Sequence, residues 1–280
     1  MPCSSSAAVL GAFALVLSLG ACGSDDSSAD TVDPDCQPAH DFQTAKEGVL
    51  TIGVVTSAPY STLDPISKEW TGMDAEWAKA IAEKECLRIE ASEVPGQDAI
   101  QKIQDGQIDL LSAGAFITPE RGEVVGQTDP LYYQFTTIVS NDGLATVEDL
   151  EGKSVGVVGG SLYVDPLRKA LGDIKEYPTT QEILADLQSG RIDAGVTASG
   201  EAFYQLDQGD YGDLEAVRIE ESPKADTLAD VYGTNMPYPK DNTAFGDALN
   251  ADIAELREDG TAQEILVNWS QDDDTTLNGS

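Results

Sequence analysis

The sequence predicts an α/β protein of two similar lobes, each a doubly wound sheet with helices on both faces. Three observations support this prediction. Short β-rich runs alternate with helical periodicity from residue 49 to residue 111, in the order β-α-β-α-β. The segment 103–109 (IQDGQID) has a near copy at 187–193 (LQSGRID), so a helix, a glycine cap and a strand occur twice. Strand-to-helix junctions at 113–121 and 159–162 supply one such junction to each lobe.

The first lobe opens with the β-rich run 49–55, which the turn residues of Ser57-Ala58-Pro59-Tyr60 end. Apolar residues at helical spacing predict a helix over 75–84. Alternation predicts a strand over 87–94, and a helical face ends at Gly106, immediately before the strand that starts at Ile108.

The second lobe begins after residue 140 and repeats the pattern with a buried strand at 154–158, helices at 166–171 and 182–187, and a strand at 192–196. Near the C-terminus, an amphipathic helix is predicted over 243–256, and Gly260 separates it from a further helix at 262–269. The tail from Gln271 is polar, and we expect residues 273–280 to fray.

Composition excludes several classes of function. The 280 residues are 41% hydrophobic, enough for one large or two small cores. The net charge is −34, from 16 Lys+Arg and 50 Asp+Glu, and no basic cluster exists to displace counterions from nucleic acid or to bind anionic lipid. Because the acidic residues are spread along the chain, a solvated surface is favoured over an acidic binding patch.

The first 21 residues have the features of a secretion signal. An apolar run at 7–19 is too short to span a membrane and leads to Leu19-Gly20-Ala21-Cys22. These four residues resemble the lipobox of bacterial lipoproteins, which implies that Cys22 is acylated after cleavage. A free or disulfide-bonded Cys22 is the alternative, and the absence of Lys or Arg before the apolar run departs from the usual signal pattern. We expect the protein outside the cytoplasm, at the cell surface or in the periplasm, lipid-anchored to the cell membrane.

Two cysteines remain outside the signal. Cys36 and Cys86 are expected to form a disulfide if the protein is exported, and metal binding by two lone cysteines is the weaker alternative. Residues 22–47 are rich in Ser, Asp, Pro and Ala, which predicts a flexible tether; His40, the only histidine, lies in it.

Arg121 is the most informative residue for function. Thr118 is a good N-cap and Pro119 suits the first helical position, so Arg121 falls in the first turn of a helix. The helix dipole disfavours a cation there, and we therefore expect an anion near Arg121, supplied by a ligand carboxylate or by a neighbouring Asp or Glu.

Other chemistry lacks support. With a single histidine, most His-dependent nucleophilic schemes are excluded, and no HExxH, zinc cysteine set, EF-hand, GxGxxG or GK[ST] motif is present. We therefore expect no metal and no cofactor. Carboxylates are too common to be informative, so a glycosidase or a dehydratase stays open on composition. Open α/β sheets bind ligands at the carboxyl ends of strands, and two facing lobes would enclose a small polar ligand.

The sequence resembles the extracellular solute-binding proteins of family 3, the amino-acid-type receptors of ABC importers. The resemblance covers about residues 48–270, in the stretches LTIGVVTSAPY, WTGMDAEWAKAIAE, IQDGQIDLLSAGAFITPERGEVVGQTDPLYY, LEGKSVGVVGGSLYVDPLRKAL, LQSGRIDAGV and AFGDALNADIAELREDGTAQEILVNW. It implies a type II periplasmic-binding-protein fold with two crossovers as a hinge. Lobe 1 would comprise 48–140 plus 230–272, and lobe 2 would comprise 141–229.

The resemblance also implies site residues. Arg121 matches the arginine that holds the ligand α-carboxylate, through two parallel hydrogen bonds. Further carboxylate contacts would come from the backbone of Ala113 and Gly114 and from the turn Gly160-Ser161. Tyr60 and Trp70 are either walls of the site or ordinary packing residues.

Three positions depart from the family pattern. Val55, Phe116 and Ala198 are apolar where the family places partners for the ligand ammonium, and the loop at 57–60 is one residue shorter. We therefore expect a small ligand with a carboxylate or similar anion, without standard α-amino recognition, and with a flatter or more apolar body beside Phe116. Glu201 or Asp64 would be the replacement carboxylate.

The expected function is a lipid-anchored, monomeric receptor that delivers a small polar solute to the permease subunits of an ABC importer. Its partners would be the small-molecule ligand, the permease and, through the anchor only, the membrane. The alternatives are a ligand-sensing lipoprotein without a transporter and a dehydratase-like enzyme on the same fold.

Overall fold

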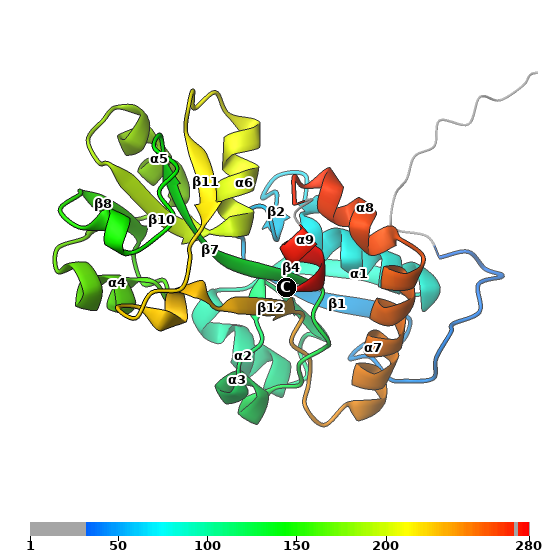
Figure 1. Ribbon diagram of the computed structural model, residues 1–280. Coiled ribbons are helices and arrows are strands. Elements are labelled where there is room, and N and C mark those ends of the chain that lie inside the picture. Colours follow the sequence, from blue (N-terminus) through cyan, green and yellow to red (C-terminus); the bar gives the residue numbers. More distant parts are fainter. Residues whose placement is uncertain (1–31, 272–273, 280) are drawn as a thin grey trace, which may run out of the picture.

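The computed structural model describes residues 32–271 and 274–279, so the predicted signal and Cys22 lie outside the described residues. Two bodies lie side by side in Figure 1, and two strands, β7 (Tyr132–Ser140) and β12 (Val231–Asn235), run between them. Lobe 1 lies on the right of this view, and lobe 2 lies on the left.

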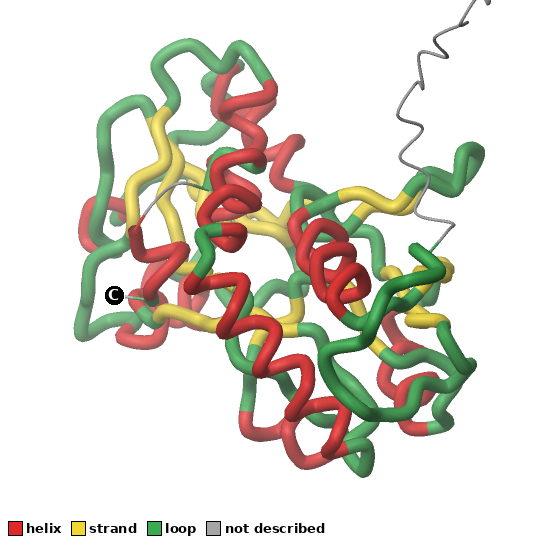
Figure 2. Tube along the Cα trace, turned by 90° about the vertical axis from the view of Figure 1, so that its right-hand side faces the viewer, coloured by secondary structure: helices red, strands yellow, loops and turns green. Residues whose placement is uncertain are grey.

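The core of lobe 1 is a three-stranded parallel sheet in the order β4-β1-β5. The central strand carries Leu50, Ile52 and Val54 on one face, fully buried in a cluster with apolar residues of α1, α7 and α8. Figure 2 views the molecule from the lobe 1 side, that is, from the right of Figure 1. In this lobe α1, α7 and α8 pack against one another. The elements of lobe 1 are β1 (Val49–Val54), β2 (Thr62–Leu63), β3 (Trp70–Thr71), α1 (Met73–Lys84), β4 (Arg88–Glu93), α2 (Gly96–Gln104), β5 (Leu110–Ser112), β6 (Ala115–Phe116), α3 (Pro119–Val124), α7 (Thr243–Glu258) and α8 (Thr261–Asn268).

A second sheet, in the order β6-β12-β7-β10-β8-β9, runs from lobe 1 into lobe 2, and β11 also pairs with β7. The first half of β7 pairs with β12 in the hinge, while its second half pairs with β10 and β11. The prediction of one separate sheet in each lobe is therefore not met. The second sheet extends across both lobes, because the 9-residue strand β7 pairs with strands in each of them. The remaining elements are η1 (Glu148–Leu150), β8 (Val155–Val158), α4 (Val164–Leu171), β9 (Lys175–Tyr177), α5 (Thr180–Gln188), β10 (Ala194–Ala198), α6 (Ser199–Gln208), β11 (Glu215–Arg218) and η2 (Asp226–Ala229).

Lobe 2 has an apolar cluster on each face of its sheet. The neighbouring residues Ile138 and Val139 point to opposite faces of β7 and belong to different clusters. Leu167 of α4 packs in the first cluster and Ile183 of α5 in the second. This is the doubly wound packing that the alternating sequence pattern predicts.

Residues 36–47, part of the predicted flexible tether, are ordered against lobe 1. Cys36 is joined to Cys86 by a disulfide, with Cα atoms 5.8 Å apart. The ring of Phe42 packs on Phe245 of α7 at a centroid distance of 5.1 Å, and Ala45 N–H donates to Asp109 Oδ1 at 2.7 Å. Residues 36–47, called the N-terminal strap below, therefore pack on lobe 1. Composition alone missed this because the partners lie far along the chain.

The C-terminal tail also differs from its prediction. Instead of fraying, it forms α9 (Asp274–Asn278), which lies against β7. Thr276 is buried, and Arg257 Nη1 donates to the carbonyl oxygen of Leu277 at 2.9 Å. Gln271 is also buried and donates to the carbonyl of Gly200 in lobe 2 at 3.1 Å. Arg257 of lobe 1 and the Gly200 carbonyl of lobe 2 thus hold this polar segment in place.

No helix in the part of the chain that the structure describes has the length and apolar character needed to cross a membrane.

Removing the disulfide is expected to destabilise the fold. The bridge joins residues 50 positions apart, and chain entropy predicts that replacing Cys36 and Cys86 together with serine lowers the free energy of unfolding by about 4 kcal/mol. Denaturant titration of the purified protein measures this difference. A reductant should destabilise the native protein by a similar amount and leave the double variant unchanged; equal sensitivity of both proteins to the reductant would contradict the prediction.

Candidate functional site

A cavity of about 210 Å³ lies between the two lobes. Strands β5, β8 and β10 all end beside it, so it occupies the position where open α/β sheets bind ligands. Its wall combines residues of lobe 1 (Ser57, Tyr60, Ala113, Gly114, Phe116), of the crossover strand β7 (Gln134) and of lobe 2 (Val158, Ser161, Leu162, Tyr163, Thr197, Ala198, Glu201).

The loop after β5 is held from behind by a fully buried carboxylate, Asp74. Its Oδ2 accepts hydrogen bonds from the N–H groups of Ala113 and Gly114, both at 3.0 Å, and from Ser112 Oγ at 3.1 Å. Its Oδ1 accepts from the Tyr132 hydroxyl at 2.8 Å. Burial raises the pKa of Asp74, and these donors oppose that rise.

This arrangement corrects one expectation about the loop. The N–H groups of Ala113 and Gly114 face Asp74 rather than the cavity, so they are not available to a ligand carboxylate. The two residues instead form part of the wall. Asp74 itself was missed because an acidic residue in the first turn of a helix is ordinarily explained by the helix dipole.

Tyr60 connects the lobes at one side of the cavity. The ring is buried and stacks on Tyr132 with centroids 6.1 Å apart, and its hydroxyl donates to the side-chain oxygen of Gln134. A Cβ at Gly200 would lie 2.7 Å from the Tyr60 hydroxyl oxygen, so the glycine in α6 makes room for the ring. Burial raises the pKa of Tyr60 well above its ordinary value, and the hydroxyl is neutral at physiological pH.

Among the residues that the structure describes, Glu201 is the only carboxylate that lines the cavity. It lies in the first turn of α6, where the helix dipole favours an anion. The hydroxyls of Thr180 and Thr197 both donate to its Oε2, the second at 3.1 Å. Within the described residues, no hydrogen bond engages Oε1. Glu201 can therefore offer one carboxylate oxygen to a ligand.

Asp64, the other replacement carboxylate considered from the sequence, lies outside the wall. It is exposed and accepts hydrogen bonds from the N–H groups of Ile66 and Ser67 at 2.8 and 2.7 Å, which lower the pKa of Asp64. Its role is to close a surface turn.

Arg121 lies beside the cavity rather than in its wall. The helix α3 starts at Pro119, and Thr118 Oγ1 accepts a hydrogen bond from Arg121 N–H at 3.2 Å. The half-buried guanidinium donates from Nη1 to the carbonyl oxygen of Phe116, and burial lowers the pKa of Arg121. It borders a second hollow of about 270 Å³, which shares Ala113, Gly114 and Phe116 with the cavity.

The structure also bears on the source of the anion expected near Arg121. Among the residues that the structure describes, no carboxylate lies within 4.0 Å of this guanidinium. One of its five donor hydrogens meets the carbonyl oxygen of Phe116, and within the described residues none meets a side-chain anion.

Two further residues expected at the site lie elsewhere. Trp70 is buried in the lobe 1 core, where its indole N–H donates to Ser61 Oγ at 2.9 Å. Gly160 is exposed with φ of 74°, while its neighbour Ser161 lines the cavity with a buried hydroxyl. The indole N–H of Trp70 finds its hydrogen-bond partner, Ser61, inside the core rather than at the cavity.

Several wall residues were not predicted. Tyr163 is buried, which raises the pKa of its hydroxyl, and it lies two residues after the Gly-Gly-Ser turn. The predicted junction 159–162 stopped just short of it. Thr197 and Gln134 lie on strands β10 and β7, where their side chains gave no signal in an alternating pattern. The other unpredicted wall residues are Ser57, Val158 and Leu162.

The two lobes, the paired crossover strands and the cavity between them define the type II fold of periplasmic amino-acid-binding proteins. Residues 50–272 match the family described as bacterial extracellular solute-binding proteins, family 3, and the chain belongs to it. The resemblance drawn from the sequence is thereby confirmed.

Relatives extend over nearly the whole chain. The probable amino-acid-binding protein YxeM of Bacillus subtilis (strain 168) is 28% identical over 279 residues, which cover 95% of this chain and 96% of that protein. The arginine-binding extracellular protein ArtP of the same organism is 25% identical, covering 93% and 96%. The solved structure of an ancestral arginine-binding protein bound to arginine is 30% identical with a TM-score of 0.62, covering 79% of this chain and 98% of that one.

Proposed function

We propose that this protein is the solute-binding receptor of an ABC importer and that it encloses a small zwitterionic, amino-acid-type metabolite between its lobes. The observation that carries this proposal is the placement of two opposite charges on two adjoining hollows that share three wall residues. Glu201 lines the cavity from lobe 2, and Arg121 borders the adjoining hollow from lobe 1. A solute with a carboxylate and an amine would meet both.

The carboxylate end is assigned to Arg121. A half-buried guanidinium loses hydration, and a ligand carboxylate restores that loss through charge-assisted, bidentate hydrogen bonds. Phe116 lines both hollows, and the proposal requires its side chain to move aside so that they join. The ligand would then extend past Phe116, with its apolar or flat part against that ring.

The amine end is assigned to Glu201. The three positions that the family uses for the ammonium are apolar here, and Glu201 stands one helical turn beyond one of them, Ala198. Oε2 is held by two threonine hydroxyls, which orients the carboxylate and leaves Oε1 for an ammonium. The neutral hydroxyls of Tyr60 and Tyr163 complete a polar wall without adding charge.

The names of the relatives agree with this ligand class, since YxeM is named as a probable amino-acid-binding protein and ArtP as an arginine-binding one. We further propose that the mature protein is a monomer, anchored outside the cytoplasm through a lipid on Cys22, and that it hands its solute to permease subunits.

A thermal-shift screen of the purified protein tests the proposed function. The panel comprises the L-amino acids and, for each, analogues that lack the carboxylate or the amine. A solute at about a hundredfold over its dissociation constant should raise stability by about 2.7 kcal/mol. The proposal fails if no amino acid or related zwitterion raises the melting temperature, or if compounds with only one of the two charges raise it more.

The same samples address the alternatives. A dehydratase would convert a prephenate-like acid into a product that chromatography detects, whereas a receptor returns the solute unchanged. A sensor without a transporter would bind equally well, and the absence of permease and ATPase reading frames beside its own would favour it.

Replacing Glu201 with glutamine is expected to weaken binding of the zwitterionic solute by about 10- to 100-fold, because a charged hydrogen bond contributes about 1.5–3 kcal/mol. Glutamine has the same shape and keeps an acceptor for the two threonine hydroxyls. Calorimetric titration measures the loss. The amine-free analogue should bind both proteins equally, and Glu220→Gln, an exposed change in the same lobe, should leave affinity unchanged. Equal weakening for solute and amine-free analogue would show that Glu201 is structural.

A further inference from the structure

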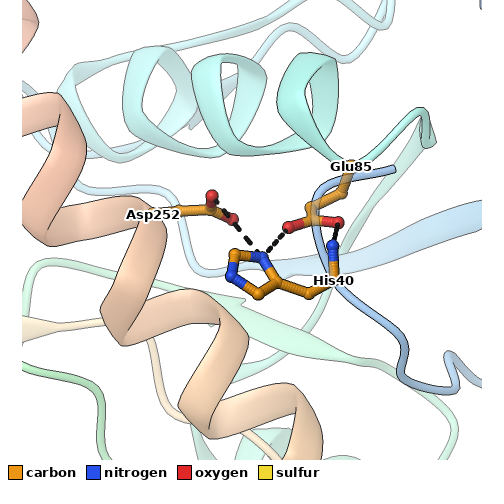
Figure 3. Close-up of side chains that lie close together, drawn as sticks. All are labelled: His40, Glu85 and Asp252. Carbon is orange, nitrogen blue, oxygen red and sulfur yellow. Dashed lines mark hydrogen bonds and ion pairs between the residues drawn. The ribbon is translucent and has the colours of Figure 1, made fainter. Parts of the chain in front are cut away.

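A second cluster of ionisable side chains lies in lobe 1, apart from the cavity. Figure 3 shows His40 of the N-terminal strap between Glu85, at the end of α1, and Asp252 of α7. His40 Nδ1 lies 2.6 Å from Glu85 Oε1 and 4.0 Å from Asp252 Oδ1. One ligand atom from each residue lies within 4.8 Å of the others. None of the three lines the cavity between the lobes.

The two carboxylates are deeply buried, with exposed fractions of 3% for Glu85 and 0% for Asp252. Glu85 is satisfied by the strap, since the backbone N–H of His40 donates to its Oε2 at 3.1 Å. Asp252 differs. Within the described residues, neither of its buried carboxylate oxygens has a hydrogen-bond partner, and His40 Nδ1 stands 4.0 Å from Oδ1. A buried carboxylate without donors is unfavourable by several kcal/mol.

The surroundings supply too little positive charge. Burial and the adjacent charge of Glu85 raise the pKa of Asp252, and the two carboxyl groups can hydrogen-bond to one another only if one of them keeps a proton. The nearest lysine, Lys84, pairs instead with the exposed Glu255 at 2.5 Å. Among the described residues, His40 is the one side chain that forms an ion pair with both buried carboxylates, and its ring is partly exposed.

We propose that His40, Glu85 and Asp252 form a binding site for a divalent transition-metal ion, with zinc as its best-fitting occupant. An imidazole nitrogen and two carboxylates are ligand types that zinc accepts, whereas calcium and magnesium prefer oxygen ligands alone. The ion would balance the two carboxylate charges. The exposed side of His40 leaves a position for water as the fourth ligand.

The geometry needs only small adjustments. Donors about 2.0–2.2 Å from a tetrahedral zinc ion stand about 3.4 Å apart. The gap between His40 Nδ1 and Asp252 Oδ1, 4.0 Å, would shorten and the gap to Glu85 Oε1, 2.6 Å, would lengthen, each by less than about 1 Å. The imidazole would bind through unprotonated Nδ1, so metal binding would release a proton.

The site would fasten the strap to lobe 1 a second time. The disulfide ties Cys36 to Cys86, the residue after Glu85, and the metal would tie His40 to both helices four residues further along the strap. Solute binding in the cavity does not depend on it, and the proposal stands or falls independently of the receptor function.

Calorimetric titration of the purified, metal-free protein with zinc tests the site. We expect one equivalent to bind, with release of a proton and a rise in melting temperature. His40→Gln and Asp252→Asn should each weaken binding at least about tenfold. Because the chain is highly acidic, Asp213→Asn, which removes one exposed carboxylate, serves as the control and should bind zinc as the native protein does.

Asp252→Asn also keeps the test free of folding defects. It removes the charge repulsion with Glu85 while preserving side-chain volume, so its metal-free melting temperature should equal or exceed that of the native protein. The site is refuted if zinc fails to saturate at one equivalent, or if His40→Gln binds zinc as tightly as the native protein. Either result would leave the cluster as an ion pair in which two carboxyl groups share a proton.

Discussion

Replacing Arg121 with alanine is expected to weaken binding of the zwitterionic solute by about 30-fold to several thousandfold. Truncating one partner of a desolvated, hydrogen-bonded charge pair costs about 2–5 kcal/mol, because the ligand carboxylate is left without its cation. Stability should change by less than about 1 kcal/mol, since the guanidinium makes one hydrogen bond among the described residues, to the carbonyl of Phe116. Calorimetry for affinity and denaturant titration for stability separate these two effects.

Two companion variants sharpen this result. Arg121→Lys keeps the charge and loses the planar pair of donors, so it should fall between the native protein and the alanine variant. Arg168→Ala removes an exposed guanidinium that pairs with Glu176 in lobe 2, and it should bind the solute normally. An Arg121→Ala protein that keeps native affinity would remove Arg121 from the site.

Replacing Asp74 with alanine is expected to lower the free energy of unfolding by about 3–5 kcal/mol, because it leaves several buried donors without their acceptor. The donors are the Tyr132 and Ser112 hydroxyls and the N–H groups of Ala113 and Gly114. Solute affinity should fall as well, since the loop that forms one cavity wall loses its support. Denaturant titration measures the first effect, and calorimetry well below the melting temperature measures the second.

Asp74→Asn keeps one acceptor oxygen and should lose about half as much stability. Asp213→Ala, which removes an exposed carboxylate, should change stability by less than about 0.5 kcal/mol. If Asp74→Ala matched that surface control, the loop would be held by other contacts.

Local rules predicted much of this fold. Threonine is a good helix N-cap and proline suits the first helical position, and α3 begins at Pro119 with Thr118 as its N-cap. The alternation of apolar runs and helical faces predicted a two-lobed α/β fold, which is confirmed. These features depend on residues close together in the sequence, or on a pattern that recurs along the whole chain.

The details of the site depend on contacts between distant residues, which no local pattern reveals. Asp74 accepts hydrogen bonds from donors that lie 38–58 positions away in the sequence. Trp70 donates a hydrogen bond to Ser61 in the core. His40 lies in a segment of low apolar content and is held by Glu85, 45 positions further on. Glu201 and Asp64 were both considered as partners for the ligand ammonium, and the sequence gives no reason to prefer either. The structure distinguishes them, because Glu201 lines the cavity and Asp64 lies on the surface.

A matched titration decides most directly whether the two lobes hold opposite charges against one zwitterion. The solute, its amine-free analogue and its carboxylate-free analogue are titrated calorimetrically into the native protein, Arg121→Ala and Glu201→Gln. We predict that Arg121→Ala weakens the solute and the amine-free analogue but not the carboxylate-free one, and that Glu201→Gln shows the reverse selectivity. If each variant weakened all three compounds by the same factor, the two side chains would not contact the ligand's charged ends, and the proposed binding mode would be wrong.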